Sequence, residues 1–373
     1  MTVRKAVVIL GSLAVLAACS NGGTNDAGGN IAVEASDDAC KVAKTEAATG
    51  NVTFEVTNKG SKVTEFYLYA EGDRILGEVE NIGPGLSRKL IVEVGEAGKF
   101  QTACKPGMKG DGIRGDFTVT GDSKKSTDGN ALLAEATKSY QRYVSSQADQ
   151  LLVKTEEFVN AVKAKKVDDA KALFPVSRTY WERIEPVAES FGDLDPKIDG
   201  REDVIEEGMA FTGYHRLEKD LWESGLQADS EKIADQLLVD VKEIVAKAKT
   251  VELTPVQLAN GAKELLDEVA TGKITGEEDR YSHTDLWDFR ANVDGSQAAI
   301  AALRPAVEQK DKALVSTLDA KFKALDEALE KQRKGDGFKS YKELTQDEIK
   351  ALAEAVDALG EPVSKVAEVV SAK

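Results

Sequence analysis

The 373-residue chain contains little histidine, cysteine and tryptophan, with two, three and three residues respectively. Both histidines, His215 and His283, lie in the second half of the chain. A blue-copper site needs two imidazoles and a thiolate, so the first half cannot build an ordinary one. Basic residues are also in deficit, with 49 against 65 acidic residues and a formal net charge of −16. Such an acidic surface disfavours nucleic acid and anionic lipid head groups and favours cations.

The one long apolar run, "AVVILGSLAVLAA", follows Arg4 and Lys5 at the N-terminus. A run of this length behind basic residues is typical of a secretory signal and is too short to cross a bilayer as a mature helix. It ends in "LAAC", which resembles a bacterial lipobox with Cys19 as the lipidated residue. An ordinary signal with an incidental Cys19 is the alternative. We therefore predict a signal peptide at 1–18, a flexible tether at 19–30 and an extracytoplasmic protein, lipid-anchored to the cell membrane on its periplasmic side or at the cell surface.

The first half shows the two-residue alternation of half-buried strands. In "NVTFEVTN", Val52, Phe54 and Val56 alternate with polar residues, and "KLIVEV" and "GDFTVTG" repeat the pattern between glycine and asparagine turns. These short strands predict an all-β sandwich at 31–120, close to the usual size of about 100 residues. The polar stretch "GDSKKSTDGN" predicts a linker at 121–133.

The second half changes to apolar residues at three- and four-residue spacings, with glycine and proline mostly between the segments. The pattern is clear in "LLVKTEEFVNAVKAKK", "SEKIADQLLVDVKEIVAKAK", "VQLANGAKELLDEVA" and "DKALVSTLDAKFKALDEALEKQRK". We therefore predict an all-α helical bundle at 134–373. The chain is thus expected to be a multidomain protein of the β plus α class.

Two cysteines besides Cys19 lie in the predicted β domain. Outside the cytoplasm, Cys40 and Cys104 are expected to form a disulfide. A second interpretation stays open, because "GKFQTACKPGMKGDGIRGDFTV" resembles the last hairpin of a cupredoxin with Met108 in the histidine position. In that case Cys40, Glu65, Cys104 and Met108 would form a metal site, and copper would be its cofactor. Copper is the less favoured alternative.

Carboxylates form three clusters in the helical half. In "TYWERIEPVAESFGDLDPKIDGRED", Glu182 and Glu185 are three residues apart, hence on one face of a helix that Pro186 kinks or interrupts. In "GYHRLEKDLW", His215 and Glu218 have the same spacing, and "GEEDRYSHTDLWDF" adds further acids. Each segment also holds a tryptophan, so part of each is expected to be buried, and buried carboxylates need a cation. Oxygen donors with one imidazole favour a hard transition-metal ion.

In chain order, the cupredoxin-like hairpin and the motifs "RTYWERIEPVAESFGDLDPKIDGRED", "FTGYHRLEKDLW" and "GEEDRYSHTDLWDFRANVDGSQ" resemble the EfeO-type iron-uptake components of the imelysin family. The resemblance covers nearly the whole mature chain. It implies a cupredoxin-like Greek-key β-sandwich followed by an imelysin-like helical domain. The family's GxHxxE motif begins at Gly213, and the last motif leaves Glu277 and Glu278 equally reachable. The metal ligands that the resemblance implies are Glu182, Glu185, Asp199, His215, Glu218 and Glu278.

The resemblance also implies a function in iron uptake. The helical domain would bind iron, as Fe3+ or Fe2+, and deliver it to a membrane iron permease, with a haem-dependent peroxidase as a further partner. Carboxylates favour Fe3+ because it is the harder ion. A zinc-dependent peptidase is the alternative, because His215, Glu218 and His283 follow the His-x-x-Glu…His order of zinc carboxypeptidases, although the stronger HExxH signal is absent. Polymer binding in an acidic cleft is a third hypothesis, ranked last.

Overall fold

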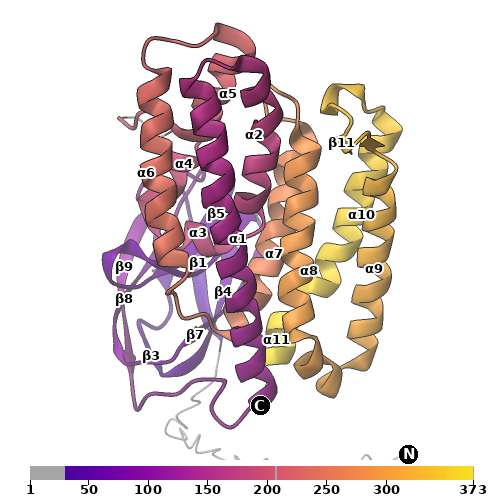
Figure 1. The fold of residues 1–373 in the computed structure, drawn as a ribbon. Coiled ribbons are helices and arrows are strands. Elements are labelled where there is room, and N and C mark those ends of the chain that lie inside the picture. The colour runs from indigo at the N-terminus through magenta and orange to yellow at the C-terminus, as the bar shows by residue number, and fades with distance from the viewer. Residues whose placement is uncertain (1–29, 206–207, 373) are drawn as a thin grey trace, which may run out of the picture.

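The computed structural model describes residues 30–205 and 208–372, which form two domains (Figure 1). Strands fill the segment from Ile31 to Thr120, and helices dominate from Ala131 onwards. The predicted class, a β-sandwich followed by an all-α domain, is confirmed. The predicted signal peptide and Cys19 lie outside the described residues.

The β domain is a sandwich of two sheets. The strands of the first sheet are, in order, β2 (Cys40–Val42), β1 (Ile31–Ala35), β4 (Gly50–Asn58) and β7 (Ser87–Val94). Those of the second are β3 (Glu46–Ala48), β9 (Ile113–Thr120), β8 (Gly98–Cys104), β5 (Thr64–Tyr69) and β6 (Ile75–Ile82). Alternate apolar side chains of both sheets fill the space between them, where Phe54 meets Phe66 and Phe117 at ring-centroid distances of 5.1 and 5.4 Å.

The helical domain consists of long helices that run side by side and short helices that connect them (Figure 1). The long helices are α1 (Ala131–Lys163), α2 (Val167–Glu182), α6 (Ser230–Ala248), α7 (Pro255–Thr271), α8 (Asp285–Lys310), α9 (Lys312–Glu330) and α10 (Gln346–Ser364). The short helices are α3 (Glu185–Glu189), α4 (Asp195–Ile198), α5 (Gly213–Lys219) and α11 (Val366–Ser371). Their apolar faces share one continuous core, as the three- and four-residue spacing predicts.

The start of α1 differs from the sequence prediction, which places a linker at 121–133. The helix begins at Ala131 because Asn130 caps it, with the side-chain oxygen accepting a hydrogen bond from the backbone amide of Leu133 at 3.1 Å. This bond satisfies one of the amides that the first turn of a helix leaves unpaired. The helical segment therefore starts three residues before the predicted boundary at 134.

The end of α9 also differs from the predicted pattern, which continues to residue 334. The helix stops at Glu330, and the following residues turn into a short hairpin of β10 (Arg333–Lys334) and β11 (Gly337–Phe338). Gly335 takes a φ of +60° in this turn, a conformation that glycine adopts without steric cost. The helical spacing of apolar residues therefore does not predict the turn that ends α9.

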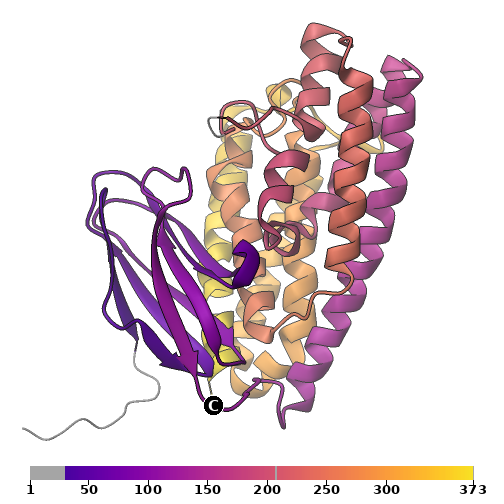
Figure 2. The ribbon, with the colours of Figure 1, turned by 90° about the vertical axis from the view of Figure 1, so that its left-hand side faces the viewer.

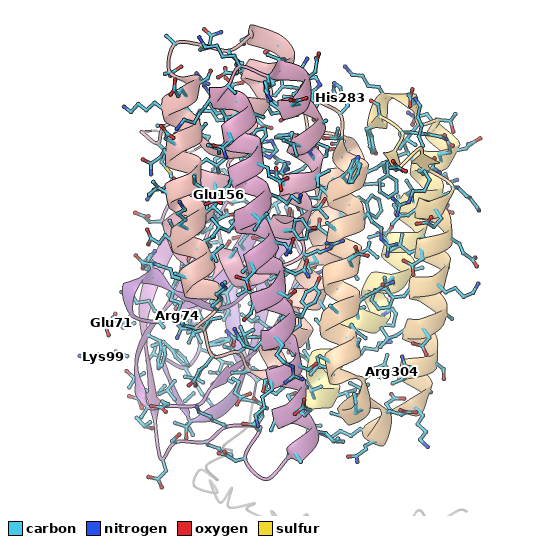
Figure 3. All side chains as sticks on the ribbon, in the orientation of Figure 1. Glu71, Arg74, Lys99, Glu156, His283 and Arg304 are labelled. Carbon is cyan, nitrogen blue, oxygen red and sulfur yellow. A yellow bond between two sulfur atoms is a disulfide. The ribbon has the colours of Figure 1, made fainter. Side chains whose placement is uncertain are left out.

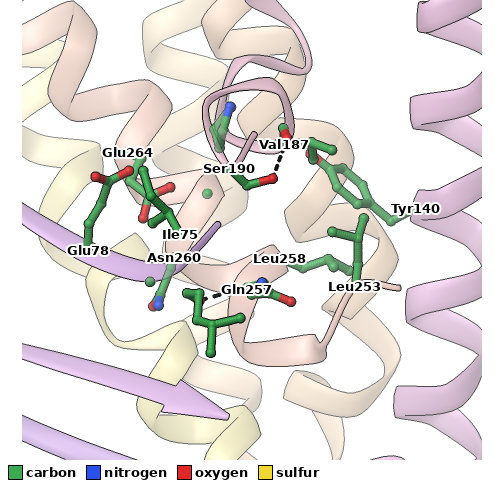
Figure 4. Close-up of a pocket in the computed structure, with 14 residues that line it drawn as sticks. Ile75, Glu78, Tyr140, Val187, Ser190, Leu253, Gln257, Leu258, Asn260 and Glu264 are labelled. Atoms are coloured by element: carbon green, nitrogen blue, oxygen red, sulfur yellow. Dashed lines mark hydrogen bonds between the residues drawn. The ribbon is translucent and has the colours of Figure 1, made fainter. Parts of the chain in front are cut away.

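The β domain lies beside the helical domain and contacts it through β6 and β7 (Figure 2). The amide of Asn260 on α7 donates to the carbonyl oxygen of Ile91 at 3.0 Å, and Lys89 pairs with Glu368 at 3.2 Å. A cavity of about 40 Å³ remains between the domains, with Glu78 on β6 and Glu264 on α7 at its edge (Figure 4). None of the residues that line this cavity is a predicted metal ligand.

Candidate metal centre

The six predicted ligands meet in the helical domain, and all six are buried. They are Glu182 at the end of α2, Glu185 at the start of α3, Asp199 after α4, His215 and Glu218 on α5, and Glu278 in the loop before α8. Their ligand atoms belong to three overlapping groups, in each of which they lie within 4.8 Å of one another. The groups are Asp199, His215 and Glu278; Glu182, Glu185 and Asp199; and His215, Glu218 and Asp279.

Gly213 allows α5 to approach α4. It has a φ of +75°, and a Cβ at this position would lie well under 3.0 Å from the carbonyl oxygen of Ile198. Thr212 adds a hydrogen bond between the same two segments, because its Oγ1 donates to the carbonyl oxygen of Lys197 at 2.9 Å. The glycine of the GxHxxE motif therefore sets the distance between His215 and the segment that follows α4.

Glu218 orients the imidazole of His215. One carboxylate oxygen lies 3.0 Å from His215 Nδ1. The other accepts three hydrogen bonds, from the backbone amides of Tyr281 and Ser282 at 3.0 and 2.8 Å and from Ser282 Oγ at 2.8 Å. Both oxygens of Glu218 are thus engaged by protein donors, which fits an orienting partner of His215 better than a metal ligand.

The other nitrogen of His215 faces two candidate ligands. Nε2 is buried and has no hydrogen-bond partner among the described residues, and it lies 3.5 Å from Glu278 Oε1 and 3.7 Å from Asp199 Oδ1. Burial and the charge of Arg178 act to lower the pKa of His215, but Glu218, Glu278 and Asp199 outweigh them and raise it to about 10. A raised pKa favours the imidazolium form with a proton on both nitrogens, and a metal ion at Nε2 would replace the proton there.

Two buried cations neutralise the carboxylates of this centre. Arg178 is fully buried on α2 and pairs with Glu182, with Asp199 and, at 3.3 Å, with Glu278. Lys273 lies 2.8 Å from Glu182 and 3.2 Å from Glu185. Isolated charges are costly to bury, so these pairs explain how so many carboxylates remain inside the domain.

The carboxylates nevertheless outnumber these cations. The buried set is Glu182, Glu185, Asp199, Glu218, Glu278, Asp279, Asp285 and Asp288. In the described part of the chain, one oxygen each of Asp279 and Asp285 and both of Asp288 lack a hydrogen-bond partner. Burial and the charge of Asp279 raise the pKa of Asp285 to about 8, and burial holds that of Asp288 well above its usual range. The centre has more negative groups than its own cations balance, so it can accept protons or a metal ion.

The structure corrects one detail of the sequence predictions and distinguishes two residues that the sequence left equivalent. Glu182 and Glu185 do not share one helix, because α2 ends at Glu182 and Pro186 occupies the first turn of α3. The two carboxylates still converge, since both contact Lys273 and the amide of Asn292. Of the two alternatives in the last motif, Glu278 points into the centre, whereas Glu277 is exposed.

Sequence reasoning missed three charged residues of the centre, Arg178, Lys273 and Asp288. Arg178 and Glu182 are four residues apart, so an ion pair between them could have been predicted. The same spacing is common on exposed helix faces, and only the fold shows that this pair is buried. Lys273 gives no local signal, because it reaches Glu182 from a distant part of the chain.

The β domain does not assemble the alternative metal site. Cys40 and Cys104 form the disulfide expected from the sequence, so neither sulfur is free to bind copper. Glu65 is buried and accepts a hydrogen bond from the Tyr67 hydroxyl at 2.9 Å. Met108 lies in the loop after β8 and is 41% exposed. No group of candidate metal ligands was found in the described residues of this domain.

The peptidase alternative is not favoured. It needs His283 beside His215 and Glu218, but among the described residues His283 belongs to none of the candidate ligand groups. His283 precedes α8 and lies near one end of the helical domain (Figure 3). The backbone amide of Tyr341 donates to its carbonyl oxygen at 2.9 Å. The His-x-x-Glu…His order therefore does not correspond to a shared site.

The fold and the buried centre define a two-domain protein with a β-sandwich and a carboxylate and histidine cluster in a helical domain. A profile of the imelysin family matches residues 136–366, and a cupredoxin-like domain profile matches 7–119. The protein named iron uptake system component EfeO from Escherichia coli (strain K12) is 37% identical over 90% of both chains. The Efem/EfeO family lipoprotein of Staphylococcus haemolyticus (strain JCSC1435) is 48% identical over 64% of this chain and 85% of its own.

The chain therefore belongs to the imelysin family, in the EfeO-type form that carries a cupredoxin-like N-terminal domain. A solved auracyanin from Roseiflexus castenholzii matches 25% of this chain and 97% of its own at 19% identity, with a TM-score of 0.21, which is too low to bear on the fold. Within the described ranges, no helix has the length and apolar character needed to span a membrane.

Proposed function

We propose that the chain is an extracytoplasmic, lipid-anchored iron-binding component of an iron-uptake system. The name of its Escherichia coli EfeO relative supports a role in iron uptake, and that of the Staphylococcus haemolyticus lipoprotein supports a lipid anchor. Iron would be held in the helical domain by Asp199, His215 and Glu278, with Glu182 and Glu185 as further oxygen donors. The chain would then release iron to a membrane permease, with a haem-dependent peroxidase as a second partner.

The observation that carries this proposal is the environment of His215. Its Nδ1 is fixed by Glu218, while Nε2 is buried without a hydrogen-bond partner in the described structure and faces Glu278 and Asp199. Imidazole ligands of metal ions commonly bind with one nitrogen while a carboxylate holds the other, which fixes the ring and increases its basicity. A buried imidazole with one orienting carboxylate and two carboxylates before its free nitrogen matches this arrangement.

The donor set favours iron over softer metals. Carboxylate oxygens suit hard cations, and one imidazole shifts the preference toward transition metals. Cys40 and Cys104, the only cysteines among the described residues, form a disulfide in the other domain. Because carboxylates dominate, we expect Fe3+ to bind more tightly than Fe2+ at this site.

The test is a titration of the purified chain with a soluble ferric chelate. The chelator then competes with the chain for the bound iron, which gives the iron affinity. His215→Ala should weaken iron binding by at least about tenfold, because a ligand is lost. His283→Ala is the matched control, since it removes the other histidine outside the candidate ligand groups. Equal iron affinity in wild type, His215→Ala and His283→Ala would show that iron binds elsewhere or not at all.

The role of Glu218 is tested separately. Glu218→Gln keeps a hydrogen-bond acceptor for His215 but removes the charge, and it should weaken iron binding about tenfold. Because Glu218 acts through His215, adding Glu218→Gln to His215→Ala should cause little further loss. Additive losses in the double variant would make Glu218 an independent ligand instead.

Delivery is the less direct part of the proposal. It predicts that the iron-loaded chain transfers iron to membrane vesicles that contain the permease, and that His215→Ala supplies little iron in the same assay. Transfer that proceeds equally well from free ferric chelate, with no effect of the chain, would remove this part while leaving the iron site in place.

A further inference from the structure

We infer that Arg178 is an exchangeable internal cation, which neutralises Asp199 and Glu278 in the absence of iron and, when iron binds, gives up these two carboxylates and turns fully to Asp279 and Asp288, with which its Nε already forms long ion pairs. This inference rests on the proposed iron site and adds a residue that is not a ligand. It assigns Arg178 control over how tightly, and hence how reversibly, iron is held. Lys273, by contrast, would remain with Glu182 and Glu185.

The guanidinium occupies the position where iron would bind. It contacts Asp199 and Glu278, the two carboxylates that face His215 Nε2, and it also pairs with Glu182. A metal ion bound by the same oxygens would compete with this contact, because two cations on the same carboxylate oxygens repel each other in a buried site. Iron binding is therefore expected to displace the guanidinium from Asp199 and Glu278.

A second set of acceptors lies next to Arg178. Its Nε is 3.5 Å from one oxygen of Asp279 and 3.5 Å from one oxygen of Asp288. Arg178 Nε, this oxygen of Asp279 and both oxygens of Asp288 are buried, and in the ranges that the structure describes none of them forms a hydrogen bond of ordinary geometry beyond these long ion pairs. Buried polar groups are rarely left unpaired, so these atoms point to an arrangement in which they are used.

The surroundings allow a short movement of the side chain. The rings of Phe174 and Tyr214 lie 5.8 and 5.9 Å from the guanidinium carbon and confine it on its apolar side. A guanidinium that turns toward Asp279 and Asp288 stays buried and stays paired, because it exchanges one set of carboxylates for another. Neither the iron-free nor the iron-loaded state then leaves the arginine charge without a partner.

The first experiment compares iron affinity in Arg178→Met and wild type, by chelator competition with ferric iron. Arg178→Met should bind iron about tenfold more tightly or better, because a competing unit charge is removed from contact with the ligands. Arg183→Met is the matched control, since Arg183 follows the same helix but pairs with Asp294 outside the centre, and it should leave iron affinity unchanged.

The second experiment tests the receiving carboxylate. Asp288→Asn removes the ionisable carboxylate with which the displaced guanidinium would pair, so it should weaken iron binding in the wild-type background. In the Arg178→Met background the same change should have no such effect, because there is no guanidinium to receive. A purely structural role of Asp288 would weaken iron binding equally in both backgrounds.

The outcomes separate the inference from the function. Iron binding by wild type, with Arg178→Met binding no more tightly, overturns the inference alone. Failure of every variant and of wild type to bind iron overturns the proposed site and the inference together. If Arg178→Met does not fold, a crystal structure of the iron-loaded wild type decides: Arg178 hydrogen-bonded to Asp288 and no longer in contact with Asp199 and Glu278 supports the exchange, and Arg178 still in contact with Asp199 refutes it.

Discussion

Replacing Gly213 by alanine tests whether the approach of α5 to α4 builds the centre. The new Cβ would face two penalties, the positive φ of +75° and the overlap with the carbonyl oxygen of Ile198. The φ strain costs about 1–2 kcal/mol. Relief of the overlap by backbone movement adds about 1–3 kcal/mol. The total of about 2–5 kcal/mol lowers the melting temperature by roughly 2–4 °C for each kcal/mol in a domain of this size.

Gly225→Ala is the matched control for this prediction. Gly225 has nearly the same φ, +72°, but a Cβ there would meet nothing within 4 Å. With a ψ of 157° it lies in a region that glycine alone readily adopts, so Gly225→Ala should show backbone strain of about 1–3 kcal/mol without the overlap. Thermal unfolding followed by circular dichroism measures both variants. Gly213→Ala should also bind iron more weakly, because His215 moves away from Asp199. A Gly213→Ala protein as stable as Gly225→Ala would show that the helix approach is not tight.

Three further predictions concern other parts of the chain. Burial and neighbouring acids raise the pKa of Glu80 to about 7 and that of Glu264 to about 8, so the native state holds these protons more tightly than the unfolded chain. The free energy of unfolding should thus fall as the pH rises from about 5 to 9, and it should fall less steeply in Glu264→Gln. An equal pH dependence of the melting temperature in both proteins would exclude this. Cys40→Ser opens a disulfide that spans 64 residues and should cost about 4 kcal/mol without changing iron affinity, as unfolding and titration can check. Cys19→Ala should abolish acylation and membrane association, and unchanged fractionation would argue against the lipobox.

The fold class is readable in the sequence because each half repeats one period. Val52, Phe54 and Val56 all face the sandwich core, as strand alternation requires. The interruptions are less predictable, since the end of α9 depends on a hairpin that pairs β10 with β11 and on Gly335 between them. Periodicity reports which face of an element is buried, but it does not report where a turn becomes more favourable than another helical residue.

The candidate centre, too, is only partly predictable from the sequence. His215, Glu218 and Glu278 are local motif residues, and their convergence follows from the motif once the fold is known. The different contacts of Glu218 and Glu278 do not follow from spacing, because Glu218 is engaged by backbone amides that lie far along the chain. The disulfide between Cys40 and Cys104, by contrast, could be predicted, because the β domain has no histidine for an ordinary copper site and cysteines outside the cytoplasm usually pair.

Burial of the whole centre has a consequence for release. Carboxylates in a dry interior attract a trivalent cation far more strongly than exposed ones do, and a carrier must later give that cation up. A protein cation that can return to the same oxygens lowers the difference in free energy between the loaded and empty states, because the empty state is not left with bare charges. Arg178 is suited to this exchange, since its guanidinium stays charged at all physiological pH values and can bridge two carboxylates. A lysine could neutralise only as a point charge, which is how Lys273 contacts Glu182 and Glu185.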